Sequence, residues 1–187
     1  NINDLGYLIG PILNAGGRLG KSQYATELLS SNNDQIIKDR STYLIKLNNK
    51  RKEIETLVLN EIDFQKIEKE NKDVIIYYNP NINEGLIGII AARLKDYFNK
   101  PSIVITVSNE LLKGSVRSVY SYNIGRVIKN SLDKDIIING GGHNMAAGFT
   151  LNKENLKDFK NFILEDFLKS NTINNSIFLY ESEITPL

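Results

Sequence analysis

The chain has 187 residues, of which 41% are hydrophobic and 24% are charged, proportions that are typical of a globular protein. Its formal net charge is only +1, so any binding of nucleic acid has to rest on a local basic patch. The absence of cysteine excludes disulfide bonds, thiolate catalysis and zinc–thiolate centres. No apolar run approaches the roughly 20 residues of a membrane-spanning helix. We expect a cytoplasmic protein, and because the first residue is not Met we interpret the chain as part of a longer one.

The first third of the chain predicts a glycine-rich start followed by helices. Residues 1–21 are rich in Gly and lack periodicity, which favours loop or strand–turn structure. A short helix is expected over 22–30. Asn33 or Asp34 can then cap a long amphipathic helix that continues to about Asn71, because neither Gly nor Pro interrupts its apolar spacing of three, four or seven.

From residue 72 onward, short β-prone runs alternate with amphipathic runs in the order βαββαββα. Strands are expected at 74–78, 102–107, 113–120, 135–138 and 145–151, and helices at 86–98, 124–132 and 152–169. This order predicts an α/β domain in which a mixed sheet is flanked by helices, preceded by the long connector helix. Residues 170–176 resemble a linker, and 177–184 predict the start of a further β element.

The segment GPILNAGGRLG at 10–20 is the first candidate site. Four glycines and one proline within eleven residues argue against a regular helix and favour a loop that exposes backbone N–H groups. Arg18 carries a planar guanidinium suited to phosphate, and Asn14 in the same segment is a second candidate contact. The alternative is a structural turn with an arginine on its surface.

The segment NEGLIGIIA at 83–91 places a Gly-containing turn at the start of an expected helix, where free N–H groups can bind an anion. It lacks the Gly-Lys-Ser/Thr of a Walker loop. Gly88, inside the helix, is more simply explained by close packing of the helix on a strand.

The segment KGSVRS at 113–118 is the third candidate. Lys113, Ser115 and Arg117 alternate along an expected strand, so they share one face. Two cations and a hydroxyl on one face suit a phosphate backbone, and Ser118 follows directly. The alternative is a solvated strand face. Two tyrosines nearby are candidates for stacking on bases: Tyr120 and Tyr122.

The segment NGGGHNMAAG at 139–148 is the fourth candidate, and we expect its glycines to form a loop. Three consecutive residues without side chains, Gly140, Gly141 and Gly142, are costly to order and suggest a place where side chains would block a ligand. His143, the one histidine of the chain, follows them and can donate to a phosphate oxygen or transfer a proton. The alternative is a buried histidine of the core.

Taken together and in this order, the four motifs resemble the RecJ family of single-strand DNA exonucleases, within the DHH phosphoesterase superfamily. The family signatures are similar to GPRINAAGRLG, GVIGIVASRL, GSxRS and GGGH followed by MAAG, and the resemblance covers residues 8–150. Two departures stand out. Ile12 replaces an arginine of the family and removes one expected phosphate contact, and Asn83 stands where a histidine is common.

The resemblance implies how the chain is divided. Residues 1–30 would end a catalytic DHH domain, 31–71 would form the connector helix, 72–170 would form the DHH-associated nucleic-acid-binding domain, and 171–187 would begin an OB-type domain. The metal ligands, for Mn²⁺ or Mg²⁺, would lie outside this chain, which with one histidine and no Asp/His cluster is not expected to bind a metal itself.

The resemblance also implies a function: part of a metal-dependent exonuclease that degrades single-stranded DNA from 5′ to 3′ in repair and recombination. His143 and the glycines would hold a phosphate, while Arg18, Lys113 and Arg117 would neutralise backbone charge. Single-stranded DNA is the expected partner, with a helicase or single-strand-binding protein as candidate helpers and a monomer as the expected state. Two alternatives are a DHH phosphodiesterase for short oligonucleotides or cyclic dinucleotides, and a nucleic-acid module that only binds.

Overall fold

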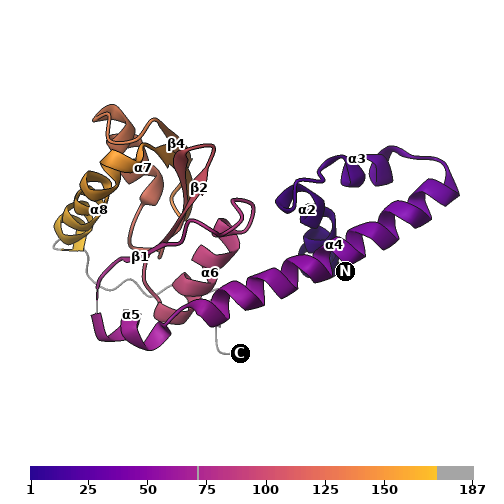
Figure 1. The fold of residues 1–187 in the computed structure, drawn as a ribbon, viewed down its shortest axis with the longest axis horizontal. Helices are drawn as coiled ribbons and strands as arrows, with labels where there is room; N and C mark the ends of the chain where they lie inside the picture. Colours follow the sequence, from indigo (N-terminus) through magenta and orange to yellow (C-terminus); the bar gives the residue numbers. More distant parts are fainter. Residues whose placement is uncertain (71, 172–187) are drawn as a thin grey trace, which may run out of the picture.

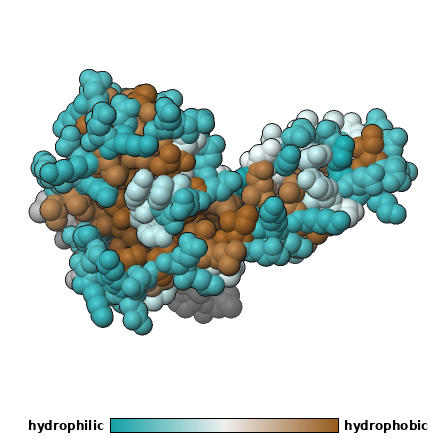
Figure 2. Space-filling view, in the orientation of Figure 1, coloured by the Kyte–Doolittle hydropathy of each residue, from teal (hydrophilic) through white to brown (hydrophobic). Residues whose placement is uncertain are grey.

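The structure is a computed structural model, which describes residues 1–70 and 72–171. A helical arm and an α/β domain lie at opposite ends of one long helix, α4 (Asp34–Glu61), as Figure 1 shows. In the space-filling view the two parts are separate bulges joined by a narrower waist (Figure 2). The strand expected at 177–184 and the linker before it lie outside the described residues.

The glycine-rich start is helical, so the expected loop is wrong. The arm consists of α1 (Ile2–Asp4), a π-helical turn η1 (Leu5–Ile9), α2 (Gly10–Arg18) and α3 (Gln23–Ser30). Pro11 lies in the first turn of α2, where a missing N–H costs nothing. A Cβ on Gly16 would lie 2.6 Å from the Lys21 carbonyl oxygen and 3.3 Å from a Leu44 methyl group. Gly16 therefore permits close packing of α2 on α4, and this tertiary contact outweighs the weak helix propensity of glycine.

Helix α4 begins where the sequence predicts, because the Asn33 side chain accepts hydrogen bonds from the amides of Gln35 and Ile36. It ends at Glu61 rather than near residue 71. After a break at Ile62 and Asp63, a separate short helix, α5 (Phe64–Glu70), follows. Ile62 is only 5% exposed and packs with the sheet domain, which gives the break a reason.

The α/β domain contains a five-stranded sheet in the order β1-β2-β3-β5-β4. β1 pairs with β2 in parallel and the remaining pairs are antiparallel, so the expected mixed sheet flanked by helices is confirmed. The strands are β1 (Ile75–Tyr78), β2 (Ser102–Ser108), β3 (Leu111–Arg117), β4 (Asn139–His143) and β5 (Ala146–Leu151). The helices are α6 (Ile87–Phe98), α7 (Ile124–Asp133), the short 3-10 turn η2 (Lys153–Asn155) and α8 (Leu156–Asn171).

The two faces of the sheet are covered unequally. On one face α7 and α8 pack on alternate residues of β2, β3 and β5, including Leu112, Val116 and Phe149. On the other face α6 contacts β2 and β3 and shares a core with α4. The residues of β5 and β4 that point to this second face include the exposed Gly148 and Gly141, so this half of the face lies open.

One strand lies later in the chain than expected. Residues 135–138 were expected to form a strand and 140–143 a loop, but the strand is β4, which contains the glycines. Asp135 instead adopts a left-handed conformation with φ of 55°. The apolar side chain of Ile137 is buried beside α7 without being part of a strand. The total order of elements, βαββαββα, is nevertheless confirmed.

Candidate nucleic-acid interface

The candidate site is the surface of β3, β5 and β4 on the same side of the sheet as α6, which leaves β5 and β4 uncovered; we call this surface the open face. Along β3 the even-numbered residues are buried and the odd-numbered ones are partly exposed, so Lys113, Ser115 and Arg117 share the open face as expected. Residues that lie directly opposite each other on adjacent antiparallel strands point to the same side of the sheet. Three rungs therefore cross the open face: Lys113–Thr150–Asn139, Ser115–Gly148–Gly141 and Arg117–Ala146–His143.

Gly148 and Gly141 of the middle rung form a floor without side chains. A Cβ on Gly141 would meet nothing within 4 Å, and one on Gly148 would meet only the Gly114 carbonyl oxygen at 3.7 Å. The other two glycines of β4 are different: a Cβ would lie 2.7 Å from Ile137 at Gly140 and 2.3 Å from the Ala146 oxygen at Gly142. Packing thus accounts for Gly140 and Gly142, while Gly141 leaves open space above the sheet.

His143 ends β4 and is exposed, which contradicts the alternative of a buried core histidine. Its Nδ1 accepts a hydrogen bond from the Met145 amide at 3.3 Å, so in the neutral ring the proton resides on Nε2. Gly125 of α7 packs on the backbone of His143, where a Cβ would lie 3.0 Å from its carbonyl carbon. The strand end is therefore fixed, and Nε2 is a donor that can face a ligand.

Arg117 and Arg18 approach each other although they are far apart in the sequence. Nη1 of Arg117 donates to Ser115 Oγ at 3.0 Å, and Nη1 of Arg18 donates to the Gly85 carbonyl oxygen at 3.1 Å. Burial lowers the pKa of the Arg117 guanidinium, and the charge of Arg18 lowers it further. Burial likewise lowers the pKa of Arg18, followed by the charge of Arg51.

Two glycines of the segment 83–91, Gly85 and Gly88, leave room for Arg18 and Arg117 to lie near each other. A Cβ on Gly85 would lie 2.1 Å from the Arg18 carbonyl oxygen, and one on Gly88 would lie 2.8 Å from Arg117 Nη2. Within residues 1–70 and 72–171, no carboxylate forms a salt bridge with Arg18 or Arg117. Against burial, which has the larger effect, the Glu55 carboxylate acts to raise the pKa of Arg18, but it is itself bound by Arg51 and Arg93. Two partly buried guanidinium groups without a salt bridge of their own favour an anion between or beside them.

Lys113 is held differently. Its Nζ lies 2.8 Å from a carboxylate oxygen of Glu84, which also accepts a hydrogen bond from Ser108. These two hydrogen bonds, that from Lys113 first, lower the pKa of the Glu84 carboxyl. The charge of Lys113 is therefore already compensated, a partnership that the sequence analysis did not identify.

Three further residues singled out in the sequence have distinct surroundings. Ser118 is 1% exposed, and its hydroxyl donates to the Tyr122 carbonyl oxygen at 2.7 Å, so it holds a turn. The expected stacking by Tyr122 is wrong: its ring is buried against Phe167, and burial raises its pKa. Asn14 is exposed on α2, away from the rungs of the sheet.

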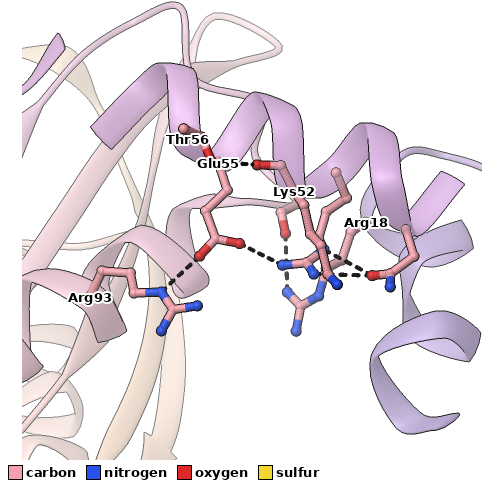
Figure 3. Close-up of polar contacts among 8 residues, drawn as sticks. Arg18, Lys52, Glu55, Thr56 and Arg93 are labelled. Atoms are coloured by element: carbon pink, nitrogen blue, oxygen red, sulfur yellow. Dashed lines mark hydrogen bonds and ion pairs between the residues drawn. The ribbon is translucent and has the colours of Figure 1, made fainter. Parts of the chain in front are cut away.

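A buried network on α4 lies next to Arg18 (Figure 3). Arg51 donates to Asn48 Oδ1 at 3.0 Å and forms a salt bridge of 2.5 Å with Glu55. The second oxygen of Glu55 lies 2.7 Å from Nε of Arg93 on α6. We call these four residues the Glu55 network; it joins the long helix to the α/β domain and was not predicted from the sequence.

The described residues do not fit a metal centre, since nowhere in 1–70 or 72–171 do three His, Asp or Glu side chains gather closely enough to hold an ion. Among the same residues, no helix is long and apolar enough to cross a membrane. The open face itself offers a cation at Arg117, a hydrogen-bond donor at His143 and bare backbone at Gly141 and Gly148, which is chemistry for binding phosphate.

Comparison with known proteins supports the resemblance expected from the motifs. The single-stranded-DNA-specific exonuclease RecJ of Haemophilus influenzae is 36% identical over 84% of this chain, and that of Bacillus subtilis is 29% identical over 98%. The chain spans only 29% and 23% of their respective lengths. The crystal structure of Thermus thermophilus RecJ in complex with Mg²⁺ covers 89% of this chain with a TM-score of 0.75 at 24% identity, and the chain covers 26% of it. That likeness confirms the fold.

The match to a family model is decisive for the α/β domain. The model of the DHHA1 domain matches residues 71–169, which are more than half of the chain and contain the whole open face. The similarity to RecJ exonucleases extends beyond this domain into the helical arm. This chain belongs to the DHHA1 domain family.

Proposed function

We propose that this chain supplies the DNA-binding part of a metal-dependent exonuclease that degrades single-stranded DNA from 5′ to 3′ in repair and recombination. One observation carries the proposal: the open face has a floor of bare backbone at Gly141 and Gly148, with Ser115 and Arg117 on one side and His143 on the other. A phosphate backbone can approach such a floor closely, and flanking cations and donors can hold it.

In the proposed complex, different residues on and beside the open face would make different contacts with the DNA phosphates. Arg117 and Arg18 would bind a phosphate of the strand, because both guanidinium groups are partly buried near the Gly85–Gly88 segment and neither forms a salt bridge in the described residues. His143 would donate from Nε2 to a non-bridging oxygen, a contact that strengthens as negative charge develops during cleavage. Lys113 would contribute only after leaving Glu84.

The proposal places the cutting chemistry outside the described residues. Thermus thermophilus RecJ has been solved with Mg²⁺ and with Mn²⁺, and this chain covers about a quarter of that protein. In the proposed arrangement, residues 1–30 end a catalytic domain, 31–71 connect it to the DNA-binding domain at 72–170, and 171–187 begin an OB-type domain.

The test is binding of fluorescently labelled single-stranded DNA to the chain as the salt concentration rises. We expect weak binding whose log–log salt slope is about 0.7 for each phosphate contact. Gly141→Val should abolish binding without lowering the melting temperature, because the new side chain enters open space. Binding without salt dependence, or a preference for a dinucleotide over a long strand, would overturn the proposal.

A further inference from the structure

Tyr120 stands at the same end of the sheet as Arg117 and His143. It occupies the tip of a turn that follows β3, closed by a hydrogen bond of 3.1 Å from the Tyr122 amide to the Val119 carbonyl oxygen. Its side chain is 64% exposed. Single exposed aromatic residues are common, so it is the position of Tyr120, beside the rung that contains Arg117 and His143, that makes its ring a candidate contact for a ligand.

The turn that carries Tyr120 is held rigidly from both sides. The Ser118 hydroxyl donates to the Tyr122 carbonyl oxygen at 2.7 Å, and the Tyr122 ring is buried against Phe167 with ring centroids 4.9 Å apart. Because the backbone on either side is fixed, Tyr120 loses little freedom when something binds to it. A preorganised exposed ring is a better binding platform than one on a mobile loop.

A second apolar side chain lies close to this turn. The Ser118 amide donates to the Met145 carbonyl oxygen at 2.8 Å, and Tyr120 is only two residues beyond Ser118, at most about 7 Å of extended chain. Met145 is 37% exposed and its own amide donates to His143 Nδ1. The rigid turn and the turn between β4 and β5 therefore bring Tyr120 and Met145 to the rim of the open face, beside the rung that contains Arg117 and His143.

We propose that Tyr120, with Met145 beside it, is a stacking platform for one unpaired base of the strand whose phosphates lie on the open face. This inference rests on the proposed function and deepens it, because phosphate contacts alone do not distinguish single strands from duplexes. Aromatic rings stack on every base, and thioethers make favourable contacts with aromatic faces. A base that is paired and stacked inside a duplex cannot reach the ring, so the platform selects single-stranded DNA without selecting its sequence.

Tyr97 provides a contrast within the same domain. It is 62% exposed, nearly the same as Tyr120, but its ring packs edge-on against Phe64 and Phe98 at 4.8 and 4.9 Å. Packing against these two phenylalanines, on α5 and α6, accounts for an aromatic ring at this exposed position. No ring of the described residues packs against Tyr120 in this way, and Tyr97 is a matched control.

The absence of tryptophan in the chain allows a direct test. Tyr120→Trp introduces a single fluorescent reporter, and Tyr97→Trp introduces the control. Each is titrated with a thymine oligonucleotide and with an abasic strand of the same length, which has the same phosphates but no bases. We expect quenching of the Tyr120→Trp emission by the strand with bases, much weaker quenching by the abasic strand, and no change for Tyr97→Trp.

Affinity provides the second measurement. The unsubstituted chain should bind the strand with bases about tenfold more tightly than the abasic strand, and Tyr120→Ser should remove this preference while leaving abasic binding unchanged. If Tyr120→Ser retains the preference, or if it lowers the affinity for both strands equally, the proposed stacking by Tyr120 is wrong, but the proposed phosphate contacts are not contradicted. If neither strand binds in a salt-dependent way, the proposed function fails, and the platform fails with it.

Discussion

Two groups of arginines lie close together where the long helix meets the α/β domain, and they differ in their partners. In the Glu55 network, Arg51 and Arg93 share one carboxylate, and Arg51 also binds Asn48. In the other group, Arg117 on the open face and Arg18 at the end of α2 donate only to a hydroxyl and to carbonyl oxygens. An arginine in an internal salt bridge stabilises the fold, whereas an arginine without a salt bridge of its own is available to an external anion. The following predictions test whether this difference separates stability from binding.

The largest effect is expected for Glu55→Ala. Glu55 is 5% exposed and Arg51 is 8% exposed, so removal of the carboxylate leaves a buried guanidinium without its counterion. The free energy of unfolding should fall by about 3–5 kcal/mol, measured by denaturant titration. Glu53→Ala, an exposed change two residues away, should alter it by less than about 0.5 kcal/mol. Equal effects of the two substitutions would contradict the assigned role of the network.

A large effect on turnover, but not on folding, is expected for His143→Ala if, as proposed, the chain is part of a longer exonuclease with a catalytic domain. Loss of one donor to the developing negative charge should lower the single-turnover rate about a hundredfold, or about 3 kcal/mol. The melting temperature should change little because His143 is exposed. Asn144→Ala, its exposed neighbour, should preserve the rate. A fall in melting temperature with a normal rate would show that His143 serves the fold.

Arg117→Gln should weaken binding of single-stranded DNA about tenfold at low salt and reduce the log–log salt slope by about 0.7, because one phosphate contact is lost. The free energy of unfolding should not decrease, since burial and the charge of Arg18 both lower the pKa of the Arg117 guanidinium and the substitution removes that charge. Arg40→Gln, which breaks an ion pair with Glu27 on the helical arm, is the matched control and should leave the slope unchanged. An unaltered slope in Arg117→Gln would place the DNA elsewhere.

The smallest effect is expected for Glu84→Gln, which frees Lys113 from its carboxylate. Affinity for single-stranded DNA should rise about twofold, since exposed ion pairs contribute about 0.2–1 kcal/mol. The pKa of the Glu84 carboxyl is lowered by the Lys113 hydrogen bond, so the pair persists at neutral pH and is lost as the pH falls through that pKa. The gain from the substitution should therefore vanish in acid. A variant that binds more weakly than the unsubstituted chain would indicate that Glu84 itself supports the site.

Regular elements with strong periodicity were predictable from the sequence. The inward face of α6, formed by Ile87, Ile90, Ala91 and Leu94, is buried as its spacing indicates, and β3 alternates as expected. The glycine-rich segments were not predictable in the same way. Gly16 serves a close approach to α4, and the glycines of β4 pair with β5, so both depend on partners distant in sequence. Local propensity favoured loops in both places, and tertiary contact outweighed it.

The candidate site was predictable as residue types but not as an arrangement. Lys113, Ser115 and Arg117 share a face because of strand periodicity alone. The approach of Arg18 to Arg117 depends on how α2 meets the Gly85 turn, which no local pattern encodes. Tyr120 and Tyr122 are equivalent in the sequence, yet the turn exposes one and buries the other.

The glycine triplet of β4 has a consequence for how this segment can diverge. Gly140 and Gly142 have atoms of the protein where a Cβ would lie, whereas Gly141 faces empty space. A library of variants selected only for folding should therefore keep glycine at positions 140 and 142 and accept other residues at 141. Selection for DNA binding should restore glycine at 141 as well. Three consecutive glycines in one strand are thus kept for two different reasons, folding at 140 and 142 and DNA binding at 141. The substitutions found in a relative would show which of the two requirements that relative has lost.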